Sequence, residues 1–227
     1  MISAVGVVVP ARDEAASVSR CLHAIRRSLL RLPVSVERTV VVVADRCTDG
    51  TAARAWPLAE VVVTDSPHTI GEVRDHGCHT ALTQLADHPT AHVLLLNTDA
   101  DTEVDSHWAA RHLGSARLGF HAATGPAHLV GEFPGGTDAA AQYRELVDHA
   151  PVNVYGANLA VRADAYTAVG RFGRTATGED HSLWQRLETA GYRLTQDPNA
   201  FVHTSARLDG RAPEGLSSLL RRLAAAD

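Results

Sequence analysis

Two aspartates, Asp99 and Asp101, carry the clearest chemical signal in the sequence. They follow the apolar run at 94–96, and residues two apart in an extended segment point to the same side. Ligands of open α/β sheets bind beyond the ends of the strands. Two carboxylates at such a point suit a hard divalent cation that keeps coordination positions open for a diphosphate. We therefore predict a Mg²⁺ or Mn²⁺ site at Asp99 and Asp101, in preference to a solvated acidic turn.

Glu179 and Asp180 form a second acidic pair, at the expected start of a helix. Thr177 and Asp180 have the spacing of a capping box, and acids favour the first turn of a helix, so a purely structural role explains the pair equally well. If Asp180 instead faces the cation, its carboxylate can take a proton from an acceptor hydroxyl, which contributes roughly 10²–10⁴-fold to a rate. Both roles stay open here.

His203 is a candidate third metal ligand. It follows the apolar run at 200–202 and precedes polar residues, which predicts the end of a strand. A neutral imidazole joins carboxylates readily on manganese. Because the chain has 13 histidines, a solvated or core role is the alternative for any single one.

Three arginines stand where they could contact phosphate. Arg74 follows Gly71 at an expected helix start, where free backbone N–H groups and a guanidinium can meet an anion. Arg207 and Arg211 flank Gly210 in a loop next to the expected metal site. They could supply the same contact or be ordinary surface arginines.

The elements that must position these residues alternate between strands and helices. β-Branched runs predict strands at 5–9, 40–43, 61–63 and 92–96. Between them, apolar residues at helical spacing predict helices at 18–29, with Asp13 as its cap, and around 78–85. This alternation predicts an α/β protein with a Rossmann-like, mostly parallel central sheet flanked by helices.

After about Gly125 the rhythm changes, without any linker. Here we expect helices at 137–148, from 179 onward and at 216–223, and strands at 152–155, 159–162, 192–195 and 200–203. A single domain over 1–227 follows, with a nucleotide-binding half at 1–104 and a half at 105–227 that completes the acceptor and metal side. The loops at 130–136 and 204–215 are expected to shape the substrate pocket.

Composition excludes several classes of protein. Of 227 residues, 45% are hydrophobic and 21% charged, which excludes a disordered or fibrous chain. The net charge is −5 without a basic block, which argues against a nucleic-acid partner. All 21 basic residues are arginine, so mechanisms that need a lysine amine are excluded. Cys21, Cys47 and Cys78 lie too far apart in sequence for a disulfide framework or a Cys-x-x-Cys zinc site.

The sequence also lacks the usual signals for membranes and export. No run approaches the roughly 18 apolar residues of a transmembrane helix, and the first residues lack the basic start and apolar stretch of a signal peptide. We therefore expect a cytoplasmic protein without a transmembrane segment.

Five short segments occur along nearly the whole chain in a distinctive order. They are VVVPARDE at 7–14, ADRCTDGT at 44–51, TDAD at 98–101, GAN at 156–158 and EDHSLWQR at 179–186. Together they resemble the family-2 glycosyltransferases of the GT-A fold. The resemblance implies that a sugar is transferred from a nucleoside-diphosphate sugar to a hydroxyl of a small or lipid-linked acceptor.

The resemblance also assigns expected roles to residues. Asp99 and Asp101 would hold the cation on the diphosphate, and Asp180, with Glu179 beside it, would match the base of the family. The nucleoside would be bound by Pro10, Ala11, Arg12, Glu14 and Asp45, with Arg74 and Asp99 near the phosphates. Gly156, Ala157 and Asn158 would line the sugar or acceptor side.

Departures from the family pattern leave parts of the function open. Asp13 stands where the family often has Asn, and Ala44 and Cys47 replace an acid and a Ser, which leaves the nucleobase open. The DRCTDGT form also resembles retaining enzymes of the glucosyl-3-phosphoglycerate synthase type, so an inverting reaction is the first expectation and a retaining one the alternative. A homodimer is compatible with the sequence.

Two other functions are kept as alternatives. A sugar-phosphate nucleotidyltransferase shares the α/β plan and the need for a cation, but usually has a Gly-rich loop with Arg and Lys near its first strand, which 10–14 does not offer. A sugar-nucleotide-binding module without catalytic activity is the other alternative.

Overall fold

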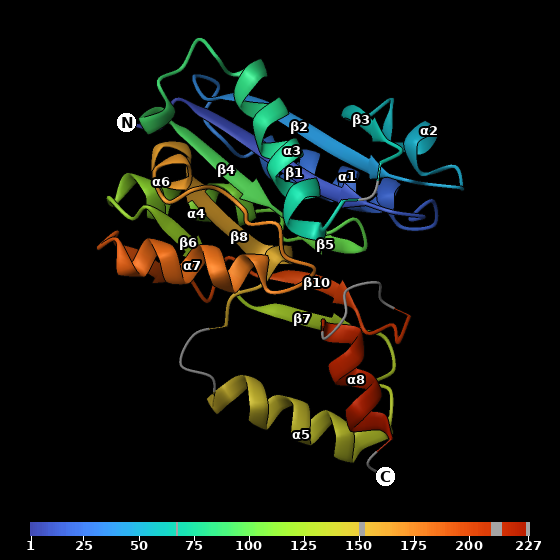
Figure 1. Cartoon of the computed structure of the whole chain (residues 1–227). Helices are drawn as coiled ribbons and strands as arrows, with labels where there is room; N and C mark the ends of the chain where they lie inside the picture. The colour runs from blue at the N-terminus through green and yellow to red at the C-terminus, as the bar shows by residue number, and fades with distance from the viewer. Residues whose placement is uncertain (67, 150–152, 210–214, 226–227) are drawn as a thin grey trace.

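A seven-stranded sheet forms the centre of the protein in a computed structural model that describes residues 1–66, 68–149, 153–209 and 215–225 (Figure 1). Its strand order is β3-β2-β1-β4-β8-β6-β9. The strands are β1 (Ala4–Ala11), β2 (Glu37–Asp45), β3 (Glu60–Thr64), β4 (Val93–Asn97), β6 (Ala122–Thr124), β8 (Leu159–Arg162) and β9 (Leu194–Gln196).

The first four of these strands are parallel, as the alternation of strands and helices predicts. β1 pairs with β2 and β4, and β2 pairs with β3. All eight residues of β1 are buried, which explains its continuous apolar sequence, because a parallel strand covered on both faces needs no polar side. β8 runs antiparallel to β4 and β6. The predicted single α/β domain with a mostly parallel sheet is confirmed.

Helices cover both faces of this sheet. They are α1 (Val18–Leu29), α2 (Thr51–Ala55), α3 (Ile70–Gln84), α4 (Trp108–Arg117), α6 (Ala163–Ala168) and α7 (Glu179–Thr189), with 3₁₀ turns η1 (Thr90–His92) and η2 (Gly156–Asn158). Val7 and Val9 of β1 belong to the core under α1 and α4, whereas Val8 belongs to the core under α3, α6 and α7. The alternation of side chains along one strand thus divides the interior into two cores.

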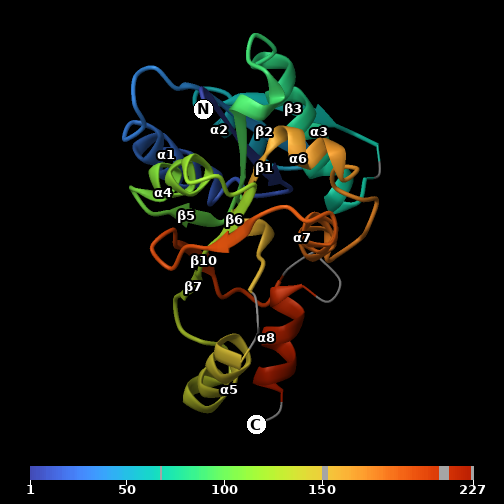
Figure 2. The same ribbon diagram turned by 90° about the vertical axis from the view of Figure 1, so that its left-hand side faces the viewer.

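A smaller part of the protein lies beyond one end of the sheet (Figures 1 and 2). It contains a three-stranded sheet of β5 (Thr102–Val104), β10 (Val202–Ser205) and β7 (Ala127–Val130), and two helices, α5 (Gly136–His149) and α8 (Leu216–Ala224). Ala139, Tyr143, Leu220 and Leu223 form the core between the two helices.

Several local expectations need correction. Asp13 does not cap α1, which begins after Ser17. Instead Asp13 has a φ of 51°, and its Oδ1 accepts from the backbone N–H of Thr48 at 2.6 Å. The Thr177–Asp180 capping box does not form, because Gly178 is the N-cap of α7 in a left-handed conformation with a φ of 72°.

The strand expected at 152–155 is also absent where it can be checked. Residues 153–155 have no regular structure, and Val152 lies outside the described residues. The strands expected at 192–195 and 200–203 begin about two residues later, at Leu194 and Val202.

Candidate active site

One large cleft, of about 840 Å³, lies beyond the carboxyl ends of β1, β2 and β4. The turn after β1 contributes Pro10, Ala11, Arg12 and Glu14, and the end of β2 contributes Asp45. The segment after β4 contributes Asp99 and Asp101, and the start of α7 contributes Glu179 and Asp180. The fold therefore brings together most of the site residues that the sequence predicts.

Asp45 is fixed at the part of the cleft next to β3. Its carboxylate accepts from Nη2 of Arg46 at 3.0 Å and from the hydroxyl of Thr64 at 3.1 Å. Arg46 has a φ of 47°, so the backbone takes an unfavourable conformation where this pair forms. Asp45 is buried but lines the cleft, and a neighbouring base or ribose could reach the remaining acceptor capacity of its carboxylate.

Asp99 and Asp101 place two carboxylates at the end of β4. The pKa of the Asp101 carboxyl is raised to about 6, first by burial and then by the negative charge of Asp99, against the opposing effect of Arg207. Two neighbouring carboxylates whose charges repel fit a divalent cation, because a bound cation relieves that repulsion. The donor set of the described residues therefore fits the predicted Mg²⁺ or Mn²⁺.

Arg74, expected near the phosphates, lines the cleft and is held there by two carboxylates. Its side chain is only 3% exposed. Its Nε donates to Oε1 of Glu179 at 2.9 Å, and its Nη2 donates to Oδ1 of Asp99 at 2.6 Å. Burial lowers the pKa of the Arg74 guanidinium, but the charges of Asp99 and Glu179 outweigh this and hold it above its usual value. Arg74 thus ties the end of β4 to the start of α7.

A capping box positions Arg74. Thr69 is the N-cap of α3, and the Glu72 carboxylate accepts from the backbone N–H of Thr69 at 2.9 Å while the N–H of Glu72 donates to the Thr69 hydroxyl. This arrangement fixes the first turn of α3, and Arg74 follows Glu72 by two residues. The sequence TIGEVR contains the capping signal, which sequence analysis overlooked.

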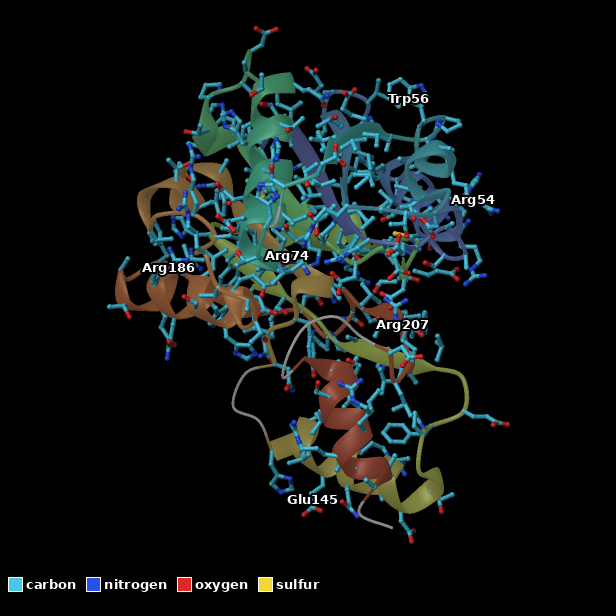
Figure 3. The ribbon with its side chains drawn as sticks, turned by 45° about the vertical axis from the view of Figure 1, so that its right-hand side comes forward. Arg54, Trp56, Arg74, Glu145, Arg186 and Arg207 are labelled. Carbon is cyan, nitrogen blue, oxygen red and sulfur yellow. The ribbon has the colours of Figure 1, made fainter. Side chains whose placement is uncertain are left out.

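Arg207 forms ion pairs with two acids that line the cleft, Glu14 and Asp101. It pairs with both carboxylate oxygens of Glu14, and its Nη2 lies 3.1 Å from Oδ2 of Asp101. The contact joins residues 193 positions apart in sequence. In Figure 3, Arg74 and Arg207 lie at the side of the sheet that faces α5 and α8. Arg211, the other arginine expected here, lies outside the described residues.

Asp180 is held next to the segment at 156–158. Its Oδ2 accepts from the backbone N–H of Gly156 at 2.6 Å, and its Oδ1 accepts from the N–H of His181 at 2.7 Å. Each oxygen keeps a further acceptor position. The neighbouring Glu179 is largely buried, and its pKa is raised by burial despite the opposing charge of Arg74. Asp180 is therefore the more accessible of the two for chemistry.

Asn158 does not line the cleft, which corrects the expectation for the last residue of the GAN segment. It is fully buried, and its Oδ1 accepts from Nε1 of Trp108 at 2.8 Å and lies 2.9 Å from Nε2 of His112. Its Nδ2 donates to the carbonyls of Pro126 and Ala200. Asn158 joins α4 to two loops, whereas Gly156 and Ala157 do line the cleft.

The structure does not bring His203 to the aspartates. In β10 it is exposed, and its ring packs near those of Phe201 and His128. The next residue, Thr204, lines the cleft instead and accepts from the hydroxyl of Thr102 at 2.9 Å. Because side chains alternate along a strand, His203 points away when Thr204 points inward.

A further acidic group lies in the loops after β1 and β2. Ligand atoms of Asp13, Cys47 and Asp49 lie within 4.8 Å of one another. These side chains already brace the loops, because Asp49 accepts from the N–H of Ala15 at 3.0 Å and from that of Thr51 at 2.9 Å. They account for the local loop structure without a ligand.

The opposite end of the cleft was not predicted as part of the site. It is lined by Tyr143, Leu146 and Val147 of α5, by Leu216, Leu219 and Arg222 of α8, and by Val154 and Tyr155. Helical spacing in the sequence predicts both helices, but not that one face of each borders the cleft.

The sheet order, the cleft at its carboxyl edge and the acidic segment after β4 define the GT-A glycosyltransferase fold, which confirms the resemblance at the level of fold. No protein-family model matches the chain, and neither does any curated protein.

Solved structures with this fold include known glycosyltransferases. The mannosyltransferase PcManGT from Pyrobaculum calidifontis, in complex with GDP-Man and Mn²⁺, matches with a TM-score of 0.60 and 19% identity over 97% of this chain and 68% of its own. TarS 1-349 of S. aureus, in complex with UDP-GlcNAc, matches with a TM-score of 0.65 and 13% identity over 99% of this chain and 66% of its own. A mycobacterial protein matches with a TM-score of 0.56 and 18% identity.

The chain thus spans about two thirds of the length of the TarS structure. Among the described residues, no helix is both long and apolar enough to cross a membrane.

Proposed function

We propose that this protein is a metal-dependent glycosyltransferase that moves a sugar, in the first instance a hexose, from a nucleoside-diphosphate sugar to an acceptor hydroxyl. The observation that carries the proposal is the shared cleft, in which the Asp99–Asp101 carboxylates and Asp180 come from different elements. The bound GDP-Man and Mn²⁺ of one structural neighbour, and the UDP-GlcNAc of another, support it.

The donor and the acceptor bind to different halves of the chain. Residues 10–14 and Asp45 bind the nucleoside, within the donor half at 1–104. The half at 105–227 supplies the acceptor side. Asp99 and Asp101 would hold Mn²⁺ or Mg²⁺, which supplies Lewis-acid stabilisation of the negative charge on the departing nucleoside diphosphate.

Asp180 acts as the general base. Its carboxylate takes the proton from the acceptor hydroxyl as the oxygen attacks the anomeric carbon, in an inverting displacement. The N–H groups of Gly156 and His181 fix the orientation of the carboxylate. Arg74 bonds to both Asp99 and Glu179 and so fixes the segment after β4 relative to the start of α7.

Donor binding is tested first. Thermal unfolding of the protein with UDP-, GDP- and TDP-sugars, with and without Mn²⁺, should show a rise in Tm with one class of donor that depends on the cation, because a ligand that binds the folded state stabilises it. If no sugar nucleotide raises the Tm but a nucleoside triphosphate and a sugar phosphate are converted to a sugar nucleotide, the protein is a nucleotidyltransferase.

The base is tested by Asp180→Asn, with Asp87→Asn as a control at an exposed aspartate in the loop before η1. We expect Asp180→Asn to keep the donor-induced rise in Tm and to lose turnover by about 10²-fold or more, while Asp87→Asn keeps both. Normal turnover by Asp180→Asn would remove Asp180 from the role of base. Binding of donor without hydrolysis or transfer by the unmodified protein would favour the non-catalytic module.

A further inference from the structure

The acceptor end of the cleft is built by two helices that stand apart from the main sheet. Figures 1 and 2 show α5 and α8 together beyond β7 and β10. On α5, Tyr143, Leu146 and Val147 line the cleft, and on α8, Leu216 and Leu219 do so. Leu146 and Val147 follow Tyr143 by three and four residues, and Leu219 follows Leu216 by three, so each set lies on one face of its helix.

Tyr143, Val147, Leu216 and Leu219 both line the cleft and belong to, or pack against, the small core of α5 and α8. Ala139, Leu220 and Leu223 already form the buried contact between α5 and α8. Leu146, in contrast, lines the cleft and is 53% exposed. Apolar side chains that border a concave surface are typical of ligand-binding pockets.

This apolar wall leads to the proposed base. Tyr143 of α5 and Tyr155 both line the cleft. Tyr155 precedes Gly156, whose N–H donates to Asp180 at 2.6 Å. A molecule lying against α5 and α8 would therefore meet the tyrosine hydroxyls and then the carboxylate that removes a proton.

The charges at this end do not favour a phosphorylated acceptor. Five of the described arginines line the cleft, and two of them, Arg12 and Arg46, belong to the turns after β1 and β2 at the donor end. Arg74 pairs with Asp99 and Glu179, and Arg207 pairs with Glu14 and Asp101. Arg222 lines the acceptor end, on the exposed side of α8. Phosphate recognition typically uses several convergent donors or a bidentate arginine fork.

We propose that the acceptor is a hydroxyl compound with an apolar body, which packs against the cleft-lining faces of α5 and α8 while its hydroxyl reaches Asp180. This inference rests on the proposed glycosyltransferase function and deepens it. It favours an apolar acceptor over the phosphorylated or carboxylated small acids used by enzymes of the glucosyl-3-phosphoglycerate synthase type.

The test compares two probes that differ only in their tail, n-octyl β-D-glucoside and methyl β-D-glucoside, with 3-phosphoglycerate as the anionic probe. Equilibrium binding is measured on the full chain with nucleoside diphosphate and Mn²⁺ present, and with the octyl compound below its micelle concentration. We expect the octyl glucoside to bind at least about tenfold more tightly than the methyl glucoside, which corresponds to burial of roughly two methylene groups.

Leu146→Ser separates this wall from non-specific binding. Because Leu146 is exposed in the free protein, the substitution should not unfold it. We expect octyl glucoside to bind this variant about tenfold more weakly, with binding of methyl glucoside and nucleotide unchanged. Leu118→Ser is the matched control, at a leucine that is 72% exposed just after α4 and does not line the cleft.

Three results would overturn the inference. These are equal affinity for the two glucosides, tighter binding of 3-phosphoglycerate, and equal effects of Leu146→Ser and Leu118→Ser. Failure of the proposed function would look different, since sugar nucleotides would then fail to raise the Tm with any cation, whatever the glucosides do.

Discussion

Replacing Arg74 by Met should destabilise the protein more than any exposed substitution in the cleft. The Arg74 side chain is 3% exposed, and its partner Glu179 is 5% exposed. Arg74→Met keeps the apolar length of the side chain but leaves the Glu179 carboxylate buried without its cation, which costs about 3–5 kcal/mol. Asp99 adds little, because its side chain is 39% exposed and water screens it.

Urea unfolding at pH 8 and pH 5 measures the free energy of unfolding, and thermal unfolding measures the Tm. A loss of about 3–5 kcal/mol lowers the Tm of a chain of this size by roughly 6–20 °C. Burial already raises the pKa of Glu179, and loss of Arg74 raises it further. A carboxyl with a raised pKa in the folded state binds protons more tightly when folded, so the variant loses stability as pH rises and its deficit should be smaller at pH 5.

A double-mutant cycle separates the ion pair from packing. Glu179→Gln removes the charge that Arg74 compensates, so the two substitutions together should cost less than the sum of the single ones, with a coupling of about 0.5–3 kcal/mol. The reasoning is refuted if Arg74→Met costs less than about 1 kcal/mol, or if the two effects are additive and the same at both pH values.

Two further predictions concern the surroundings of the site. Burial lowers the pKa of His112 from its usual value of 6.5 to about 4. Since the unfolded state then binds protons more tightly, the protein should lose up to about 3 kcal/mol of stability as pH falls from 6.5 to 4. Urea unfolding of His112→Gln should show a smaller loss. A Cβ on Gly156 would lie 2.4 Å from Nη2 of Arg74, so Gly156→Ala should lower kcat by about tenfold or more, and an unchanged kcat would contradict the proposed geometry.

Hydrophobic patterning was sufficient to predict the four parallel strands β1 to β4 of the main sheet. β1 and β4 are buried strands of a parallel sheet, so their sequences are continuously apolar and unambiguous. β5 and β6 have three residues each, too short for a periodic pattern to identify them. Their pairing depends on partners distant in sequence, such as Thr102 with Thr204.

Side-chain direction explains the errors at the site. Asn158 precedes β8 as expected, but His203 lies inside β10 and not at the end of a strand. A shift of one residue decides whether a strand residue faces the cleft or solvent. Thr204 therefore lines the cleft where His203 was expected, and Asn158 satisfies buried groups of other elements. Neither outcome has a signal in the local sequence.

The acceptor side was the least predictable part. Leucines at 216 and 219 predict an amphipathic helix, but the sequence does not show that part of the apolar face of α8 borders a cleft while Leu220 and Leu223 pack against α5. The loop at 130–136, expected to shape the pocket, does not line it. The segment at 204–215 contributes Thr204, Ser205, Arg207 and Gly215 to the cleft, together with the faces of α5 and α8.

Calorimetric titration of the protein with nucleoside diphosphate, with and without Mn²⁺, tests the central claim most directly, because Asp99 and Asp101 are proposed to hold the cation that binds the diphosphate. We predict binding that Mn²⁺ strengthens by about tenfold or more, and loss of that dependence in Asp101→Asn, with folding intact by circular dichroism. Equal affinity with and without Mn²⁺, or an unchanged dependence on Mn²⁺ in Asp101→Asn, would contradict the account.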